Sequence, residues 1–256
     1  MKKTFGPVLS LSGNRKALSS IVIAILVIGV VLVVVGGISA YVLYTAGNPK
    51  TETMSFSDFT ALEVGSAFQV NIEKSDAYSV KITASESIFD RVQVTKTGET
   101  LKIEVLPGFF FGTFELKAEI TMPMLSRLDL SGATKGTADG FSSTEQFVAK
   151  LSGASSLEMT NFELRDVDFE LSGASHLIAA GTGSDLVSDV SGASNLDLTN
   201  FHLNDANVTL SGASHATINL DGRLDVDASG LSSLEYIGEP TLGTINTSGG
   251  SSVNKK

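Results

Sequence analysis

The phrase "LSGAS" occupies residues 151–155, and it returns at 171–175, as "VSGAS" at 190–194, and at 210–214. Aligned on the serine-glycine pair, the series runs through positions 131, 152, 172, 191, 211, 229 and 248, which are 18 to 21 residues apart. A sustained period near twenty residues indicates a solenoid, in which every repeat contributes one coil.

The residues that flank the phrase alternate between apolar and polar. Val167, Phe169 and Leu171 share one face of their segment, and acidic residues occupy the other face. A period of two predicts a strand with one buried face. A coil of this length holds two or three short strands and buries its apolar face only by stacking, at about 4.8 Å per coil. The sequence therefore predicts an all-β fold, a parallel β-helix, with a right-handed path from the general chirality of crossovers.

The repeated phrase itself is predicted to form the corners of the coils. Glycine tolerates positive φ, and serine hydroxyls bond to nearby backbone. The alternative is a repeated ligand loop, but no aspartate recurs as in calcium-binding nonapeptides, and G-x-S-x-G is absent. We therefore expect structural turns without catalytic, cofactor or metal sites. The predicted corner residues are Ser131, Gly132, Ser152, Gly153, Ser172, Gly173, Ser191, Gly192, Ser211, Gly212, Ser229 and Gly230.

The position after each corner forms a predicted outward ladder. His176, Asn195 and His215 follow three successive corners and are candidate contact residues. The two histidines would lie two rungs apart, about 9.6 Å, and one metal ion with bonds of about 2.1 Å does not bridge that distance. A solvated polar edge is the alternative interpretation.

Composition limits the possible partners. The 256 residues include no cysteine, which excludes disulfides and thiolate metal sites. Residues 51–256 hold 13 basic and 28 acidic residues, a net charge of −15, which argues against nucleic-acid binding. Some β-helices cleave polysaccharides with clustered acids, and Asp166, Asp168 and Glu170 lie beside Arg165. No side chain is placed as a general base, so we expect no enzyme.

The N-terminal segment is predicted to be a membrane anchor. No charge occurs at 17–49, and the apolar run at 21–44 exceeds the roughly 20 residues that a span needs. A cleaved signal, the alternative, has an apolar core of only about 7–15 residues. Basic residues precede the run, which places the N-terminus in the cytoplasm and the bulk outside the cell membrane. The expected parts are a basic segment at 1–17, a transmembrane helix at 18–45 and a linker at 46–55.

The start of this helix resembles a processing signal. "KALSSIVIAILVIGVV", from Lys16, is similar to the class III signal of archaeal type IV pilin-like proteins. The resemblance implies cleavage between Ala17 and Leu18, with the helix left attached. With or without this cleavage, the helix stays attached and the domain remains anchored outside the cell membrane.

Residues 56–130 are expected to form a β-rich cap before the repeats at 131–250 and a tail at 251–256. "KTGET" at 96–100 is typical of a hairpin, and "PGFFFG" at 107–112 is expected to cap the core, or else to contact a membrane or partner. The sequons at Asn207 and Asn246 would permit N-glycosylation on an outside surface.

The order of segments carries a family resemblance. "FTALEVGSAFQVNIEKSDAYSVKITAS" is followed by "GETLKIEV" and by "ITMPMLSRLDLSGAT", which leads into the repeats. Over residues 56–247 this resembles the auto-transporter adhesin head GIN domain family. The resemblance implies a β-helical surface domain without agreed catalytic residues. We expect surface adhesion through a protein or glycan ligand. The alternatives are a structural or regulatory envelope component, pilin-like or coupled to a stress sensor, and a polysaccharide-active enzyme.

Overall fold

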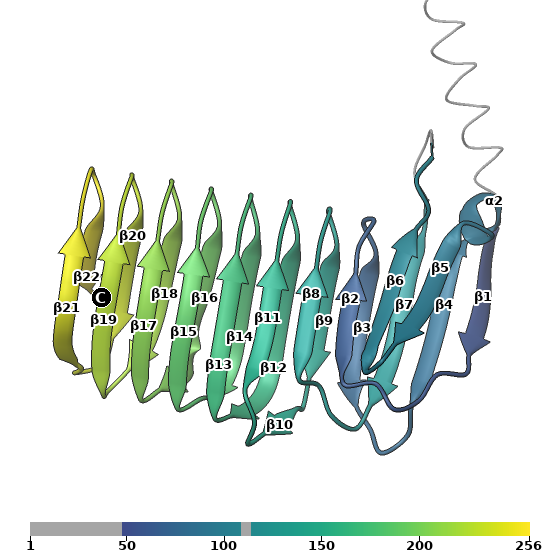
Figure 1. Cartoon of the computed structure of the whole chain (residues 1–256), viewed down its shortest axis with the longest axis horizontal. Helices are drawn as coiled ribbons and strands as arrows, with labels where there is room; N and C mark the ends of the chain where they lie inside the picture. Colours follow the sequence, from purple (N-terminus) through teal and green to yellow (C-terminus); the bar gives the residue numbers. More distant parts are fainter. Residues whose placement is uncertain (1–47, 109–113) are drawn as a thin grey trace, which may run out of the picture. The chain divides into compact units, whose positions relative to one another are not determined.

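The computed structural model describes residues 48–108 and 114–256. These residues form an all-β solenoid of about six turns with coils of about twenty residues, which confirms the predicted fold class (Figure 1). The predicted transmembrane helix at 18–45, the processing site at Ala17 and Leu18, and Phe109 to Phe111 lie outside the described residues. Within the described ranges, no helix has the length and hydropathy to cross a bilayer.

Each coil contributes one strand to each of two sheets. Strand β13 (Asp166–Leu171) lies in sheet B, and after the corner β14 (His176–Thr182) lies in sheet A. The next coil repeats this path with β15 (Asp185–Val190) and β16 (Asn195–Leu203). Strand β13 pairs with β15 and β14 with β16, both in parallel, so the backbone of one coil is satisfied by its neighbours.

The two sheets run the length of the described domain (Figure 1). Sheet A also contains β1 (Pro49–Met54), β3 (Gln69–Lys74), β4 (Ser79–Ser85), β7 (Leu116–Met122), β9 (Lys135–Asp139), β10 (Ser142–Ser143), β12 (Ser156–Leu164), β18 (His215–Leu220), β20 (Ser233–Ile237) and β22 (Ser252–Lys255). Sheet B also contains β2 (Ala61–Val64), β5 (Val92–Thr97), β6 (Thr100–Val105), β8 (Arg127–Leu130), β11 (Phe147–Leu151), β17 (Asp205–Leu210), β19 (Arg223–Ala228) and β21 (Thr241–Thr247).

A continuous apolar core fills the space between the sheets. Val167, Phe169 and Leu171 are buried as the alternation predicts. Aromatic rings follow one another through several coils, and Phe169 lies 6.5 Å from both Phe147 and Phe201, measured between ring centroids. Each coil buries its apolar side chains by stacking on its neighbours, because an isolated coil would leave them exposed to solvent.

The N-terminal part departs from chain order. Strands β6 and β7 lie beyond β2 and β3, so the coil of β2 and β3 sits between β6/β7 and β8/β9. Strands β5, β4 and β1 then extend the two sheets with antiparallel pairing. The short helix α2 (Glu86–Phe89) packs Ile88 and Phe89 against this end. The predicted N-terminal β cap is thus present, and residues 96–100 form the β5–β6 hairpin turn.

Two expected connecting segments contain strands. Residues 46–55, expected to be a linker, include β1, which pairs with β4. The expected tail at 251–256 includes β22, which pairs with β20. The sequence of neither segment alternates between apolar and polar residues. In β1, every residue but Met54 is exposed. Backbone pairing with an existing sheet edge, and not side-chain burial, makes these residues extended.

Candidate functional site

The corner glycines lie one above another along one edge of the solenoid. Gly153 and Gly173 have φ values of 75° and 78°. The backbone amide of Ala174 donates to the carbonyl oxygen of Gly153 at 2.7 Å, and the same bond recurs at the other corners of the series. Glycine suits this position because φ is positive and the backbone of the preceding coil leaves no room for a side chain.

The last residue of each corner phrase is buried and holds the turn. Ser155, Ser175 and Ser232 each donate their hydroxyl to the carbonyl oxygen three residues earlier, at 2.8 Å. The equivalent hydroxyl of Ser214 is buried without a hydrogen-bond partner in the described structure. The phrase is thus a repeated backbone turn, and its buried serine is not accessible from solvent.

The sequence did not predict the corner at residues 65–67. Gly65, Ser66 and Ala67 connect β2 to β3 and stack beside Gly132, since a Cβ on Gly132 would lie 3.3 Å from the Ser66 nitrogen. Ser66 and Ala67 have φ values of 62° and 64°, which non-glycine residues seldom adopt. The segment lacks the serine-glycine order of the other corners. The sequence feature that could have predicted this corner is a run of small residues between two segments that alternate between apolar and polar residues.

The predicted ladder of His176, Asn195 and His215 is in register on sheet A. The Asn195 side-chain nitrogen lies 3.0 Å from Nδ1 of His176. Nδ1 of His215 instead lies 2.7 Å from the hydroxyl of Ser233. The three side chains are half-buried, and Nδ1 of each histidine is engaged by a neighbouring side chain of the sheet. In residues 48–108 and 114–256, no group of three histidine or acidic side chains has metal-binding geometry.

A groove that combines polar side chains with an apolar floor begins at this ladder and extends towards the N-terminal cap. Its volume is about 600 Å³, and it crosses β7, β3, β9, β12 and β14 on the outer face of sheet A. Five adjacent strands span about 19 Å, which suits an extended ligand. The groove is lined by Gln69, Val70, Asn71, Lys117, Lys135, Gly136, Thr137, Ser156, Leu157, Glu158, His176 and Ile178.

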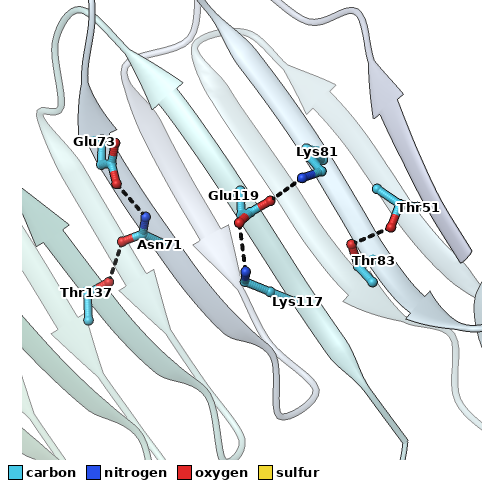
Figure 2. A network of polar contacts seen from close by, with 8 residues as sticks. All are labelled: Thr51, Asn71, Glu73, Lys81, Thr83, Lys117, Glu119 and Thr137. Carbon is cyan, nitrogen blue, oxygen red and sulfur yellow. Dashed lines mark hydrogen bonds and ion pairs between the residues drawn. The ribbon is translucent and has the colours of Figure 1, made fainter. Parts of the chain in front are cut away.

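A hydrogen-bonded network fixes one side of this groove (Figure 2). Glu119 accepts from both Lys117 and Lys81 at 2.7 Å, and these bonds lower the pKa of its carboxyl to about 2. Thr137 donates to the amide oxygen of Asn71 at 2.7 Å, and the Asn71 amide nitrogen donates to Glu73. The network restrains these side chains before any ligand arrives.

The centre of the groove holds polar groups without such restraint. Lys135 and Glu158 form no ion pair with any residue that the structure describes, and both are exposed. Ser156, the register partner of Lys135, and Gln69, on its other side, add a hydroxyl and an amide. A cation, a carboxylate, an amide and a hydroxyl in one groove can bond a ligand rich in hydroxyl or peptide groups.

The opposite sheet carries a second recess of about 540 Å³ beside the corners. Its charges are largely engaged with one another: Lys150 pairs with Glu170, and Lys102 with Glu104. Elsewhere on this sheet Arg223 pairs with Asp225, and that pair together with the Thr244 amide lowers the pKa of Asp225 to about 2. Groups held in ion pairs are poorly placed to bind a new ligand.

The acidic residues weighed as polysaccharide-cleaving groups lie on this sheet. Arg165 forms an ion pair with Asp166 at 2.7 Å. Burial, together with the charge of Glu170, raises the pKa of Asp168. The sequon residues Asn207 and Asn246 are exposed on β17 and β21. Modification at either asparagine would therefore project outward.

Several solved structures have the same fold. A crystal structure titled as a putative adhesin from Bacteroides fragilis NCTC 9343 matches with a TM-score of 0.74 and 17% identity, over 82% of this chain and 97% of that one. One titled as a putative lipid binding protein from Parabacteroides distasonis ATCC 8503 has a TM-score of 0.63, 17% identity and the same coverage. A putative adhesin from the same organism has a TM-score of 0.59, with 15% identity over 81% of this chain and 97% of its own.

A comparison with curated protein sequences gave no match. At these identities, the structural likeness establishes the fold alone. The family model described as "Putative auto-transporter adhesin, head GIN domain" matches residues 58–240, which include the corners, the ladder and the groove. The chain therefore belongs to the auto-transporter adhesin head GIN domain family.

Proposed function

We propose that this protein is a non-enzymatic, membrane-anchored surface module that binds a glycan or protein ligand through the polar groove of sheet A. The observation that carries the proposal is the groove itself, where Lys135 and Glu158 form no ion pair with any described residue and lie among hydroxyl and amide groups. The network around Glu119 holds the neighbouring side chains in place, which lowers the entropic cost of binding. The names of the related adhesins are consistent with such a role.

The test is a glycan and surface-protein binding array probed with the full chain in detergent. We expect a defined ligand, and we expect Lys135→Ala to weaken its binding by about tenfold or more. Lys96→Ala is the matched control, because Lys96 is an exposed lysine of β5 outside the groove. Absence of any ligand, or equal losses from both variants, would contradict this use of the groove.

Anchoring in the cell membrane is part of the same proposal. It is supported by the uncharged segment at 17–49 and the basic residues before it. Protease added to intact cells should digest residues 48–256 and spare the N-terminus. Cleavage as in pilin-like proteins would give Leu18 as the first residue in N-terminal sequencing, whereas a Met1 or Lys2 start would exclude it. Such cleavage would favour the alternative role as a pilin-like envelope component.

The glycan-cleaving alternative has a separate test. Asp225 and Asp227 of β19 form a second acidic group on sheet B, beside Arg223. Changing Asp166, Asp168, Asp225 and Asp227 together to asparagine should leave the full chain's effect on any bound glycan unchanged, because no turnover is expected in either protein. Loss of a measurable cleavage activity in this variant would instead establish an enzyme.

A further inference from the structure

The two ends of the solenoid are finished differently. At one end, β1, β4 and β5 extend the sheets with antiparallel strands, and α2 packs beside them. At the other end, β21 pairs with β19 and β22 pairs with β20, and no described strand lies on their outer sides (Figure 1). Both sheets therefore present backbone N–H and C=O groups that no described strand pairs.

The exposed edge lacks the charge that usually protects such strands. Strand β21 reads "TLGTINT", seven residues without a charged side chain. Residues 240–256 contain no acidic residue, although the whole chain has a net charge of −10. The two lysines of this segment are engaged, Lys255 with Glu239 and Lys256 with Glu235. Two copies can approach at this end without the repulsion that the rest of the surface imposes.

The same end exposes apolar side chains. Leu242 of β21 is 49% exposed, and Leu231, in the β19–β20 corner one coil before the end, is 75% exposed. Tyr236, Ile245 and Val253 pack against the core but are only partly buried. A partner at this end would cover apolar area in addition to pairing two strands.

We infer that two copies of this chain associate end to end, with β21 and β22 each pairing antiparallel with the same strand of the second copy. A two-fold axis reverses strand direction, so each edge strand meets itself in the antiparallel arrangement. Strand β21 brings no charge to this contact. A single extended peptide would satisfy one sheet only, whereas a second solenoid end supplies two strands about 10 Å apart.

This arrangement closes as a dimer. The contact uses the same surface of both copies, so two copies complete it and a third copy cannot join at that surface. The dimer leaves the groove near the N-terminal cap free, since β7, β3, β9, β12 and β14 lie several strands from β22. Association would therefore present two grooves on one assembly, which raises avidity for a repeated ligand.

The first test measures the mass of the full chain in detergent by light scattering over a range of concentrations. We expect a dimer, and we expect Leu242→Lys to weaken association by about tenfold or more because it places like charges at the contact. The matched control is Val187→Lys, since Val187 is 54% exposed on β15 in the interior of the same sheet. This control should remain dimeric.

The second test uses the absence of cysteine in the chain. Thr244→Cys, at the middle of β21, should form a disulfide-linked dimer on mild oxidation, whereas Thr209→Cys on β17 should not. It keeps the inference testable if Leu242→Lys fails to fold. A wild-type chain that stays monomeric at all concentrations overturns the inference. So does a dimer that Leu242→Lys leaves intact and Thr244→Cys does not cross-link, because another surface would then hold it.

Discussion

Gly173 lies directly against Gly153 at neighbouring corners, and a Cβ built on Gly173 would stand 2.4 Å from the Gly153 carbonyl oxygen. The atom it meets is backbone that accepts the Ala174 amide, so it cannot move without breaking the bond between coils. The corner phrase therefore sets both the turn and the distance between coils.

Gly173→Ala should destabilise the domain by about 3 kcal/mol or more, from the positive φ and the backbone clash together. Gly98→Ala is the control, because Gly98 has a φ of 60° but no atom within 4 Å of a built Cβ. That control should lose only about 1 kcal/mol. Urea unfolding of both variants checks the difference, and similar losses would contradict the role of coil contact.

The buried corner serines offer a matched pair of hydrogen-bond variants. Ser175→Ala removes a bond of 2.8 Å to the Ser172 carbonyl and should cost about 1 kcal/mol. Ser214→Ala removes a hydroxyl that has no partner in the described structure, so it should be neutral or slightly stabilising. Equal losses in free energy of unfolding would show that the hydrogen bond is not what distinguishes the two corners.

The aromatic core should be sensitive to truncation. Phe169→Ala removes the ring that lies between Phe147 and Phe201, and it should cost about 3 to 5 kcal/mol from lost burial and the cavity left behind. Val187→Ala, on the outer face of the same sheet, should change stability by less than about 0.5 kcal/mol. A small loss for Phe169→Ala in thermal unfolding would contradict a continuous core.

Stability should depend on pH through Glu119. The carboxyl pKa is about 2 in the folded chain against an ordinary value of 4.5, because Lys117 and Lys81 bond to its charged form. A lowered folded pKa stabilises the fold above the unfolded value, and this contribution is lost as pH falls from about 4.5 towards 2. The stability gap between the wild type and Glu119→Gln should therefore be larger at neutral pH than near pH 2.

The control for this effect is Glu119→Gln in a chain that also carries Lys81→Met and Lys117→Met. Without the two ammonium groups, the same substitution should show little pH dependence over that range. If the stability difference still depends on pH in this background, the pH dependence arises from another part of the cap. The measurement is the urea midpoint as a function of pH.

The ladder beside the groove could be predicted from the sequence. The position after each corner gave His176, Asn195 and His215 as neighbours, because strands in a stacked solenoid keep a constant register. The groove beside them could not be found in this way. It depends on Gln69 lying next to Lys135, and the two residues are 66 positions apart in the chain, on β3 and β9.

By itself, the sequence determined the solenoid: a repeated corner phrase and apolar alternation admit one way of burying the core, and both are local patterns. The tertiary structure decided the order of the N-terminal strands, the strand character of residues 49–54 and the set of residues that line the groove. These features depend on backbone pairing between distant segments and on side-chain lengths across neighbouring strands. Backbone pairing produces no periodic pattern in the sequence, because every residue except proline carries the same N–H donor whatever its side chain.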